Sequence, residues 1–126
     1  MMMPTCTKFT AEEDDCVSSS QKNLSGVVLD NTKFTCKIYN FGAHVVSWRS
    51  KSDLEVYKTK PEFLFLSEKA ILDGTKAIRG GIPICFPQFG KLGGCTNQHG
   101  FARNATWDFV DSEVDAARAM AKATFT

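Results

Sequence analysis

The chain has no long apolar run, no strong excess of charge of one sign and no signal-like N-terminus, and each absence excludes a class of protein. No stretch approaches the roughly 20 apolar residues of a transmembrane helix. A net charge of +1 lacks the basic excess typical of nucleic-acid binders. The N-terminal residues have no basic start followed by an apolar core, and they carry the acidic run Glu12–Asp15. We therefore expect a cytoplasmic protein without nucleic-acid or membrane partners.

The five cysteines contain no C-x-x-C pair, and their odd number does not fit a disulfide framework. Reduced thiols fit better, and we expect Cys36 and Cys85 to be buried as small apolar side chains. Cys85, Cys95 and His99 could in principle bind zinc, but no second nearby histidine completes the site, so no metal is expected. A nucleophile pair of Cys95 and His99 is imaginable, although nothing in the sequence indicates an activated thiolate.

The pattern of apolar residues predicts an all-β fold. A length of 126 residues allows one domain. Residues 1–23 are polar, serine-rich and acidic, so we expect a mobile tail there and a folded domain over residues 24–126. The expected strands are Val27–Leu29, Phe34–Tyr39, Ala43–Trp48, Val56–Tyr57, Phe63–Leu66, Thr106–Val110 and a last one from about Ala119.

Two segments lack a clear strand pattern. Ala116–Ala123 also has good helix propensity, so a helix is the alternative to the last strand. Glycine and proline density predicts that residues 78–98 are mainly irregular loop. Short strands at this spacing indicate a β-sandwich or barrel. The expected core aromatic residues are Phe34, Trp48, Phe65 and Trp107.

The stretch from Ile78 to Phe109, IRGGIPICFPQFGKLGGCTNQHGFARNATWDF, is the most informative part of the chain. Its glycines let the backbone approach a ligand closely. Arg79 and Arg103 offer two-pronged recognition of phosphate or carboxylate, and the aromatic rings suit the faces of a sugar. The stretch therefore indicates a site for a small anionic ligand. The alternatives are surface arginines and a structural His99, and His44, in an apolar strand, is expected to be structural.

The paired motifs IRGGIPICFPQFG and QHGFARNATW, preceded by FGAHVVSWRS and FLFLSEKAILDGTKAIRGG, resemble the glucose-6-phosphate 1-epimerase family, also called hexose-6-phosphate mutarotases. The resemblance covers about Leu24–Thr126. It implies a galactose mutarotase-like β-sandwich, or supersandwich, which is incomplete in this chain because only an N-terminal portion is present. It also implies interconversion of the α and β anomers of glucose 6-phosphate or a related hexose 6-phosphate. Such a reaction needs a general acid and a general base, with no metal or cofactor.

The resemblance also assigns roles to single residues. The positions that match the family's substrate-binding residues are Arg79, Gln98, His99 and Arg103. The family's general acid is a second histidine and its base a glutamate late in a longer protein, so both are expected beyond Thr126. Neither His44 nor Glu113 lies in a motif that matches these two catalytic roles, so no catalytic residue is expected here and the chain alone should be inactive.

Three hypotheses about the chain remain. It is part of a longer hexose-6-phosphate epimerase, or a natural short form that binds sugar phosphates or other carbohydrates without catalysis, or a β-domain that shares only the fold. The presence of both motifs in order disfavours the third. In the first two hypotheses the expected partner is a small hexose phosphate.

Overall fold

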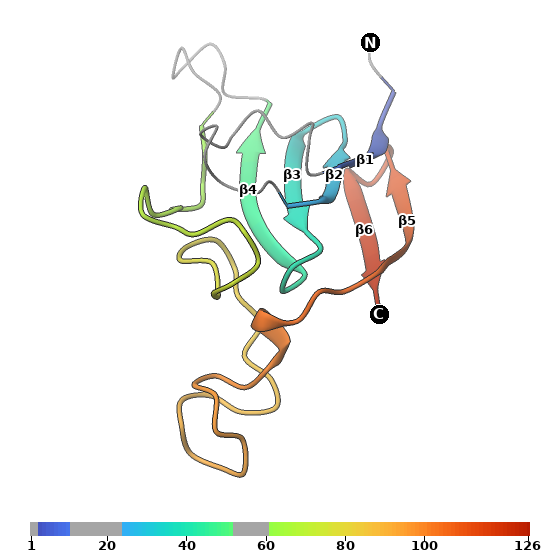
Figure 1. The fold of residues 1–126 in the computed structure, drawn as a ribbon. Helices are drawn as coiled ribbons and strands as arrows, with labels where there is room; N and C mark the ends of the chain where they lie inside the picture. Colours follow the sequence, from blue (N-terminus) through green and yellow to red (C-terminus); the bar gives the residue numbers. More distant parts are fainter. Residues whose placement is uncertain (1–2, 11–23, 52–60) are drawn as a thin grey trace.

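The computed structural model describes residues 3–10, 24–51 and 61–126, which are almost entirely strand and loop (Figure 1). Four strands form an antiparallel sheet in the order β1-β2-β3-β4, and two more form a hairpin. The elements are β1 (Thr5–Phe9), β2 (Gly26–Asp30), β3 (Phe34–Tyr39), β4 (His44–Ser50), the short 3-10 helix η1 (Ala102–Asn104), β5 (Phe109–Asp115) and β6 (Met120–Phe125). The predicted all-β fold is confirmed. No helix in these described parts is long and apolar enough to cross a membrane.

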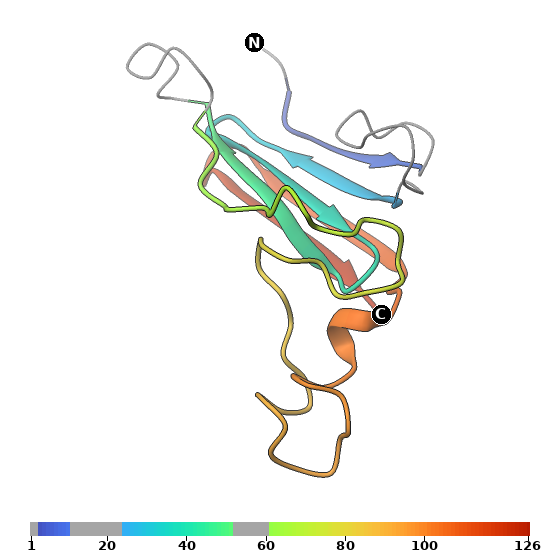
Figure 2. The same ribbon diagram turned by 60° about the vertical axis from the view of Figure 1, so that its left-hand side comes forward.

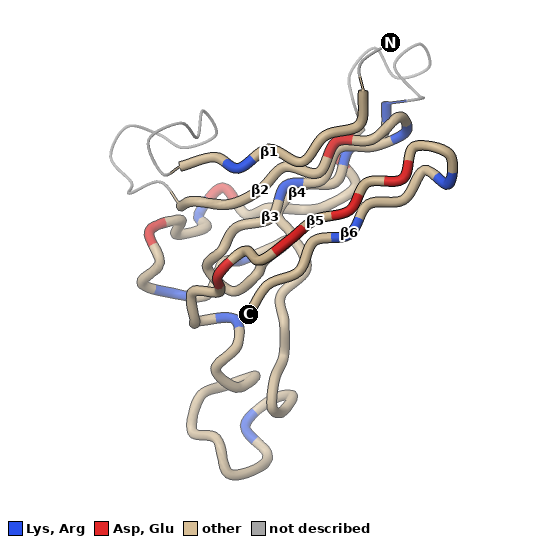
Figure 3. Tube along the Cα trace, turned by 90° about the vertical axis from the view of Figure 1, so that its right-hand side faces the viewer, with Lys and Arg blue, Asp and Glu red and all other residues tan. Residues whose placement is uncertain are grey.

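The central strands β2 and β3 put apolar side chains on one face of the sheet, because successive residues of a strand alternate between faces. The resulting hairpin-side cluster consists of Val27, Leu29, Cys36 and Ile38. The β5–β6 hairpin packs on this face through side chains that include Phe109 and Phe125 (Figure 2). Asp111, Glu113 and Lys122 on the hairpin are exposed. Figure 3 shows charged positions along both of its strands. The sheet and the hairpin therefore form the two layers of a sandwich.

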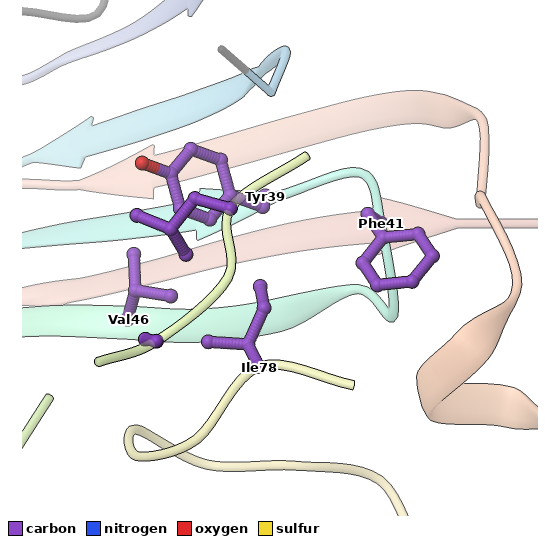
Figure 4. Close-up of a cluster of buried hydrophobic side chains, with 6 residues drawn as sticks. Tyr39, Phe41, Val46 and Ile78 are labelled. Atoms are coloured by element: carbon purple, nitrogen blue, oxygen red, sulfur yellow. The ribbon is translucent and has the colours of Figure 1, made fainter. Parts of the chain in front are cut away.

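The opposite face of the sheet is covered by loop. The loop-side cluster consists of Tyr39, Phe41, Val46, Ala70, Leu72 and Ile78 (Figure 4). The first three come from β3, β4 and the turn between them, and the others come from the segment that follows Pro61 and crosses the sheet (Figure 2). Burial of this cluster fixes the path of the chain up to Ile78, directly before Arg79.

The turn between β2 and β3 is closed by a buried asparagine. Asn31 is 1% exposed, and its side-chain oxygen accepts hydrogen bonds from the Lys33 and Phe34 N–H groups at 2.8 and 2.9 Å. Asparagine favours such turns because its side chain can bond to the backbone a few residues on.

β4 contains a β-bulge at Val46, because its register opposite β3 skips this residue. An extra residue moves the following side chains to the face opposite the one that strict alternation would give them. Trp48 thereby packs against the Phe34 ring, with 5.3 Å between the ring centroids. The Ser47 hydroxyl meanwhile donates a hydrogen bond to the Glu62 carboxylate on the other side.

Most of the predicted strands are confirmed. β2, β3 and β4 lie where their apolar residues predicted strands, and β6 begins at Met120, which excludes the helix considered for Ala116–Ala123. The stretch between Ile78 and Gln98 is irregular, as its glycine content predicted. The strand expected at Val56–Tyr57 lies outside the described residues.

Three expectations about the elements are wrong. Thr5–Phe9, which we assigned to a mobile tail, pairs along its length with β2, because the pairing satisfies its backbone groups while most of its polar side chains stay exposed. Phe63–Leu66 is no strand, and the segment makes only isolated bridges, one from Glu62 to Arg49 and one from Leu66 to Gly80. The strand expected over Thr106–Val110 begins only at Phe109.

The expected core aromatics are also less buried than predicted. Phe34 and Trp107 are half-buried, whereas Trp48 is 40% and Phe65 77% exposed. Trp48 lies on β4 at the edge of the sheet, and Phe65 lies in the covering loop, where its backbone rather than its ring makes the contacts. Neither position is enclosed from both sides. In the described residues the core consists mainly of smaller side chains from β2, β3 and the loop.

Candidate functional site

A pocket of about 420 Å³ opens between the loop that leads to Arg79 and the segment around η1. It brings together the four residues singled out in the sequence, Arg79, Gln98, His99 and Arg103. The other lining residues are Lys69, Ile71, Thr75, Lys76, Ala77, Ile78 and Asn104. Of all the described residues that line the pocket, none is acidic and four are lysine or arginine. A concave surface with charge of one sign attracts ligands of the other, so the pocket suits an anion.

Arg79 extends into the pocket from a fixed backbone. Ile78 before it is 4% exposed in the loop-side cluster, whereas the Arg79 residue is exposed. The Arg79 carbonyl accepts a hydrogen bond from the Ser67 N–H at 3.0 Å, and Gly80 after it forms a bridge with Leu66. Within the described chain no hydrogen bond or ion pair engages the Arg79 guanidinium. Its donors are therefore available to a ligand.

The segment that carries Gln98 and His99 is held by a backbone contact around Gly100. The Phe86 N–H donates to the His99 carbonyl at 3.1 Å, and the Phe86 carbonyl accepts from the Phe101 N–H at 2.9 Å. Gly100 lies between them with a φ of 78°. A Cβ atom at this position would lie 2.7 Å from the Pro87 nitrogen and closer still to the Phe86 carbonyl oxygen. Only glycine fits such an approach, which turns the chain so that its neighbours reach the pocket.

Arg103 lies in η1 and is held along one edge. Its Nη2 donates to the Gln98 carbonyl oxygen at 2.8 Å, and its Nε is buried without a partner among the described residues. η1 is tied down by Trp107, whose indole N–H donates to the Ala102 carbonyl at 2.9 Å. A guanidinium fixed on one side keeps its remaining donors in a set direction. This arrangement suits paired recognition of phosphate or carboxylate oxygens.

His99 is oriented by its own loop. Its Nδ1 accepts a hydrogen bond from the Gly90 N–H at 2.9 Å, and its backbone N–H donates to the Gly90 carbonyl at 2.8 Å. Because Nδ1 is the acceptor, the neutral ring carries its proton on Nε2, which can donate to a ligand hydroxyl. The Phe89 ring stacks at a tilt beside it, with centroids 4.6 Å apart. The two alternatives for His99, structural and ligand-binding, are therefore compatible.

Lys69 and Lys76 also line the pocket, and the sequence did not single them out. Both are exposed and come from the loop that crosses the sheet before Arg79. The available signal was the closeness of three cations in one loop-forming stretch. Loop lysines are mostly solvated, however, so this signal does not distinguish pocket lysines from surface ones.

The four cysteines of the described residues do not line the pocket. Cys85 is exposed, contrary to our prediction, because its stretch of loop packs against neither cluster. Cys36 is buried as predicted, and burial, with a smaller contribution from the Glu62 charge, raises the pKa of its thiol to about 11. The Cys95 backbone exchanges hydrogen bonds with the Gln88 side chain. Among the described residues no group of three or more His, Cys, Asp or Glu could hold a metal ion.

Comparison with known proteins identifies relatives of similar sequence. A protein from Cenchrus ciliaris named "Putative glucose-6-phosphate 1-epimerase" is 49% identical over 91 residues, which are 71% of this chain and 25% of the relative. A protein of the same name from Escherichia coli K12 is 34% identical over 94 residues, 74% of this chain and 30% of the relative. The chain thus spans less than a third of the curated relatives that it matches.

A solved structure and a family model agree with these relatives. The crystal structure described as a "putative mutarotase" from Salmonella typhimurium superposes with a TM-score of 0.61 and 32% identity, over 74% of this chain and 30% of that one. This likeness is consistent with a galactose mutarotase-like sandwich that is incomplete in this chain. The model of the family described as aldose 1-epimerase matches residues 25–125. The chain therefore belongs to the aldose 1-epimerase family.

Proposed function

We propose that this chain supplies the anion-binding part of a hexose-phosphate site. In the protein of which such a site is a part, the reaction is interconversion of the α and β anomers of glucose 6-phosphate or a related hexose 6-phosphate. The observation that carries the proposal is a pocket whose described lining has no acidic residue and brings two lysines and two arginines together with Gln98 and His99. A phosphate needs fixed cations, and hydroxyl groups of a sugar need neutral donors and acceptors, so both halves of the ligand find partners.

The roles divide according to chemistry. The guanidinium of Arg79, which has no partner among the described residues, and the oriented guanidinium of Arg103 are suited to the phosphate, since each offers paired donors. The Nε2 proton of His99 and the Gln98 amide are suited to sugar hydroxyls. The family membership and the names of the relatives support the sugar.

Catalysis needs more than this pocket offers. Anomer interconversion requires one group that protonates the ring oxygen and another that takes the proton of the anomeric hydroxyl. Of the described lining residues only His99 is a candidate for proton transfer, and there is no carboxylate. We therefore propose that the chain by itself binds the sugar phosphate without accelerating the reaction. This is also the second candidate function, a non-catalytic sugar-phosphate-binding domain.

The test is ligand binding by the purified chain, measured by calorimetry or by NMR titration. Glucose 6-phosphate should bind, and glucose should bind much more weakly. Arg103→Ala and Arg79→Ala should each weaken glucose 6-phosphate binding by about 10- to 150-fold, because a hydrogen bond to a charged group contributes roughly 1.5–3 kcal/mol. The matched control is Arg118→Ala, which removes an exposed arginine beside Asp115 on the β5–β6 turn and should change nothing.

Two results would contradict the proposal. Equal losses of affinity for glucose and glucose 6-phosphate in the arginine variants would mean that these residues do not recognise phosphate. Binding of glucose 6-phosphate that is as strong in both pocket variants as in Arg118→Ala would place the site elsewhere. Activity of the chain is read by NMR exchange between anomers after subtraction of the spontaneous rate, and clear acceleration would refute the non-catalytic reading.

A further inference from the structure

The turn between β3 and β4 touches both segments that carry the pocket arginines. On the Arg103 side, the Gly42 N–H donates to the Ala105 carbonyl at 2.6 Å and the Trp107 N–H donates to the Asn40 carbonyl at 2.9 Å. A Cβ atom on Gly42 would lie 2.9 Å from the Arg103 carbonyl oxygen, so the two backbones are in direct contact. The position of η1 is therefore set by this turn.

On the Arg79 side, the connection is made by a side chain. His44, the first residue of β4, is 1% exposed, and its Nε2 lies 2.6 Å from the Gly80 carbonyl oxygen. Gly81 and Ile82, which follow Gly80, are also held by hydrogen bonds. The Gly81 N–H donates to the Phe65 carbonyl at 2.7 Å, and the Ile82 N–H donates to the Val45 carbonyl at 2.8 Å. Gly81 packs so closely that a Cβ atom on it would lie 2.9 Å from His44 Nε2.

The hydrogen bond fixes the chemical state of His44. A carbonyl oxygen only accepts, so Nε2 must carry the proton and Nδ1 is unprotonated in the neutral ring. Nδ1 is buried and has no partner among the described residues, so a second proton there would find no acceptor. Burial lowers the pKa of His44, the bond to Gly80 opposes this, and the positive charge of Arg103 lowers it further. The ring therefore stays neutral and acts as a fixed donor.

We propose that His44 is a positioning residue for the anion pocket, which holds the Arg79 segment at a set distance from the Arg103 segment through the Gly80 carbonyl. The ligand in this inference rests on the proposed function, whereas the positioning itself does not. His44 does not line the pocket, so it acts only through the backbone that it holds. Replacement of an ordinary buried histidine would lower the stability of the whole fold. Replacement of a positioning residue would loosen the Arg79 segment more than the sheet.

The experiment compares two variants of His44 and one control in the complete chain. His44→Leu removes the donor at similar volume, and His44→Gln keeps an N–H donor. Asn31→Ala is the control, because it disrupts a buried polar residue in the β2–β3 turn, remote in sequence from both pocket segments. Two quantities are measured by NMR and calorimetry: the hydrogen-exchange rates of the Gly81 and Ile82 amides relative to β2 and β3, and the affinity for glucose 6-phosphate.

In His44→Leu we expect these two amides to exchange on the order of tenfold faster relative to the sheet, and the affinity to fall on the order of tenfold. His44→Gln should recover most of both, and Asn31→Ala should lower the melting temperature while changing neither. Unchanged relative exchange in His44→Leu would overturn the proposal. Equal losses of amide protection and of glucose 6-phosphate affinity in His44→Leu and Asn31→Ala would also overturn the proposal.

Absence of ligand binding and failure of His44→Leu to fold each leave another measurement that tests the role of His44. If the unaltered chain does not bind glucose 6-phosphate, the proposed function fails, and amide exchange alone then decides the role of His44. If His44→Leu does not fold, the imidazole ¹⁵N shifts of the unaltered chain decide it. At neutral pH they should report a proton on Nε2, and a proton on Nδ1 instead would overturn the proposal.

Discussion

Replacement of Gly100 by alanine should destabilise the segment that carries the pocket residues Gln98 and His99. Gly100 has a φ of 78°, and an alanine there costs roughly 1–2 kcal/mol for the left-handed backbone. Its Cβ would also lie 2.7 Å from the Pro87 nitrogen and closer to the Phe86 carbonyl oxygen, which cannot retreat without losing its bond to the Phe101 N–H. Forcing extra atoms into packed structure adds about 1–3 kcal/mol. The sum is about 2–5 kcal/mol.

Two neighbouring glycines provide matched controls for these two contributions. Gly90 has a φ of 69° but nothing within 4 Å of a Cβ, so Gly90→Ala should cost only the backbone term of about 1–2 kcal/mol. Gly94 has neither constraint, so Gly94→Ala should be neutral or stabilise by about 0.4–1 kcal/mol through the unfolded chain. The order of stability is therefore Gly94→Ala, then Gly90→Ala, then Gly100→Ala.

The assay combines urea unfolding with hydrogen exchange. If the segment around Gly100 opens while the sheet stays folded, urea unfolding will understate the destabilisation by Gly100→Ala. Faster hydrogen exchange of the Phe101 amide will then report it. Gly100→Ala should also weaken glucose 6-phosphate binding, since Gln98 and His99 directly precede this contact. A Gly100→Ala variant with the stability and Phe101 exchange of Gly90→Ala would refute the argument from close backbone approach.

Two further predictions concern other parts of the molecule. Alkylation at pH 8 followed by mass spectrometry should modify exposed Cys85 rapidly and Cys36 last, because a thiol with a pKa of about 11 is only about one part in a thousand thiolate there; equal rates would contradict the burial of Cys36. The bonds from Ser47, the Trp48 N–H, the Leu64 N–H and Arg49 lower the pKa of the Glu62 carboxyl against its desolvation. Its contribution to stability should be present above the ordinary glutamate pKa and be lost as the pH falls through the lowered value. The free energy of unfolding should therefore decline less on acidification in Glu62→Gln than in the unaltered chain, and parallel pH profiles would contradict this.

The strands with a short apolar run or a pattern of apolar alternation could be predicted from sequence, whereas a mostly polar strand could not. β3 reads as period two because Phe34, Cys36 and Ile38 all meet the hairpin-side cluster. β1 was missed because its side chains are mostly polar, and only its pairing with β2, far along the chain, makes it a strand. The apolar residues of Phe63–Leu66 predicted a strand wrongly, because Phe63 and Phe65 are exposed and their apolar character does not indicate burial in a sheet.

The candidate site was predictable to the extent that its motif is local. Arg79 and Arg103 stood out because glycines flank or precede them, and the structure brings both to one pocket. Lys69 and Lys76 were not predictable, because nothing near them in sequence marks the loop as turning back toward η1. The link through His44 depends on a contact between residues 36 positions apart, which no periodicity encodes.

The bulge at Val46 makes the number of residues in β4 part of the specification of the fold. If these residues alternated strictly, with no bulge, Trp48 would lie on the loop side and Ser47 on the hairpin side. The indole would then lose the Phe34 ring, and Glu62 would lose its serine donor. A deletion of Val46 would instead leave Ser47 opposite Lys37 and Trp48 opposite Cys36, and would remove one side chain from the loop-side cluster. In an alignment with an unbulged strand, a one-residue gap at Val46 therefore keeps the residues on each face equivalent.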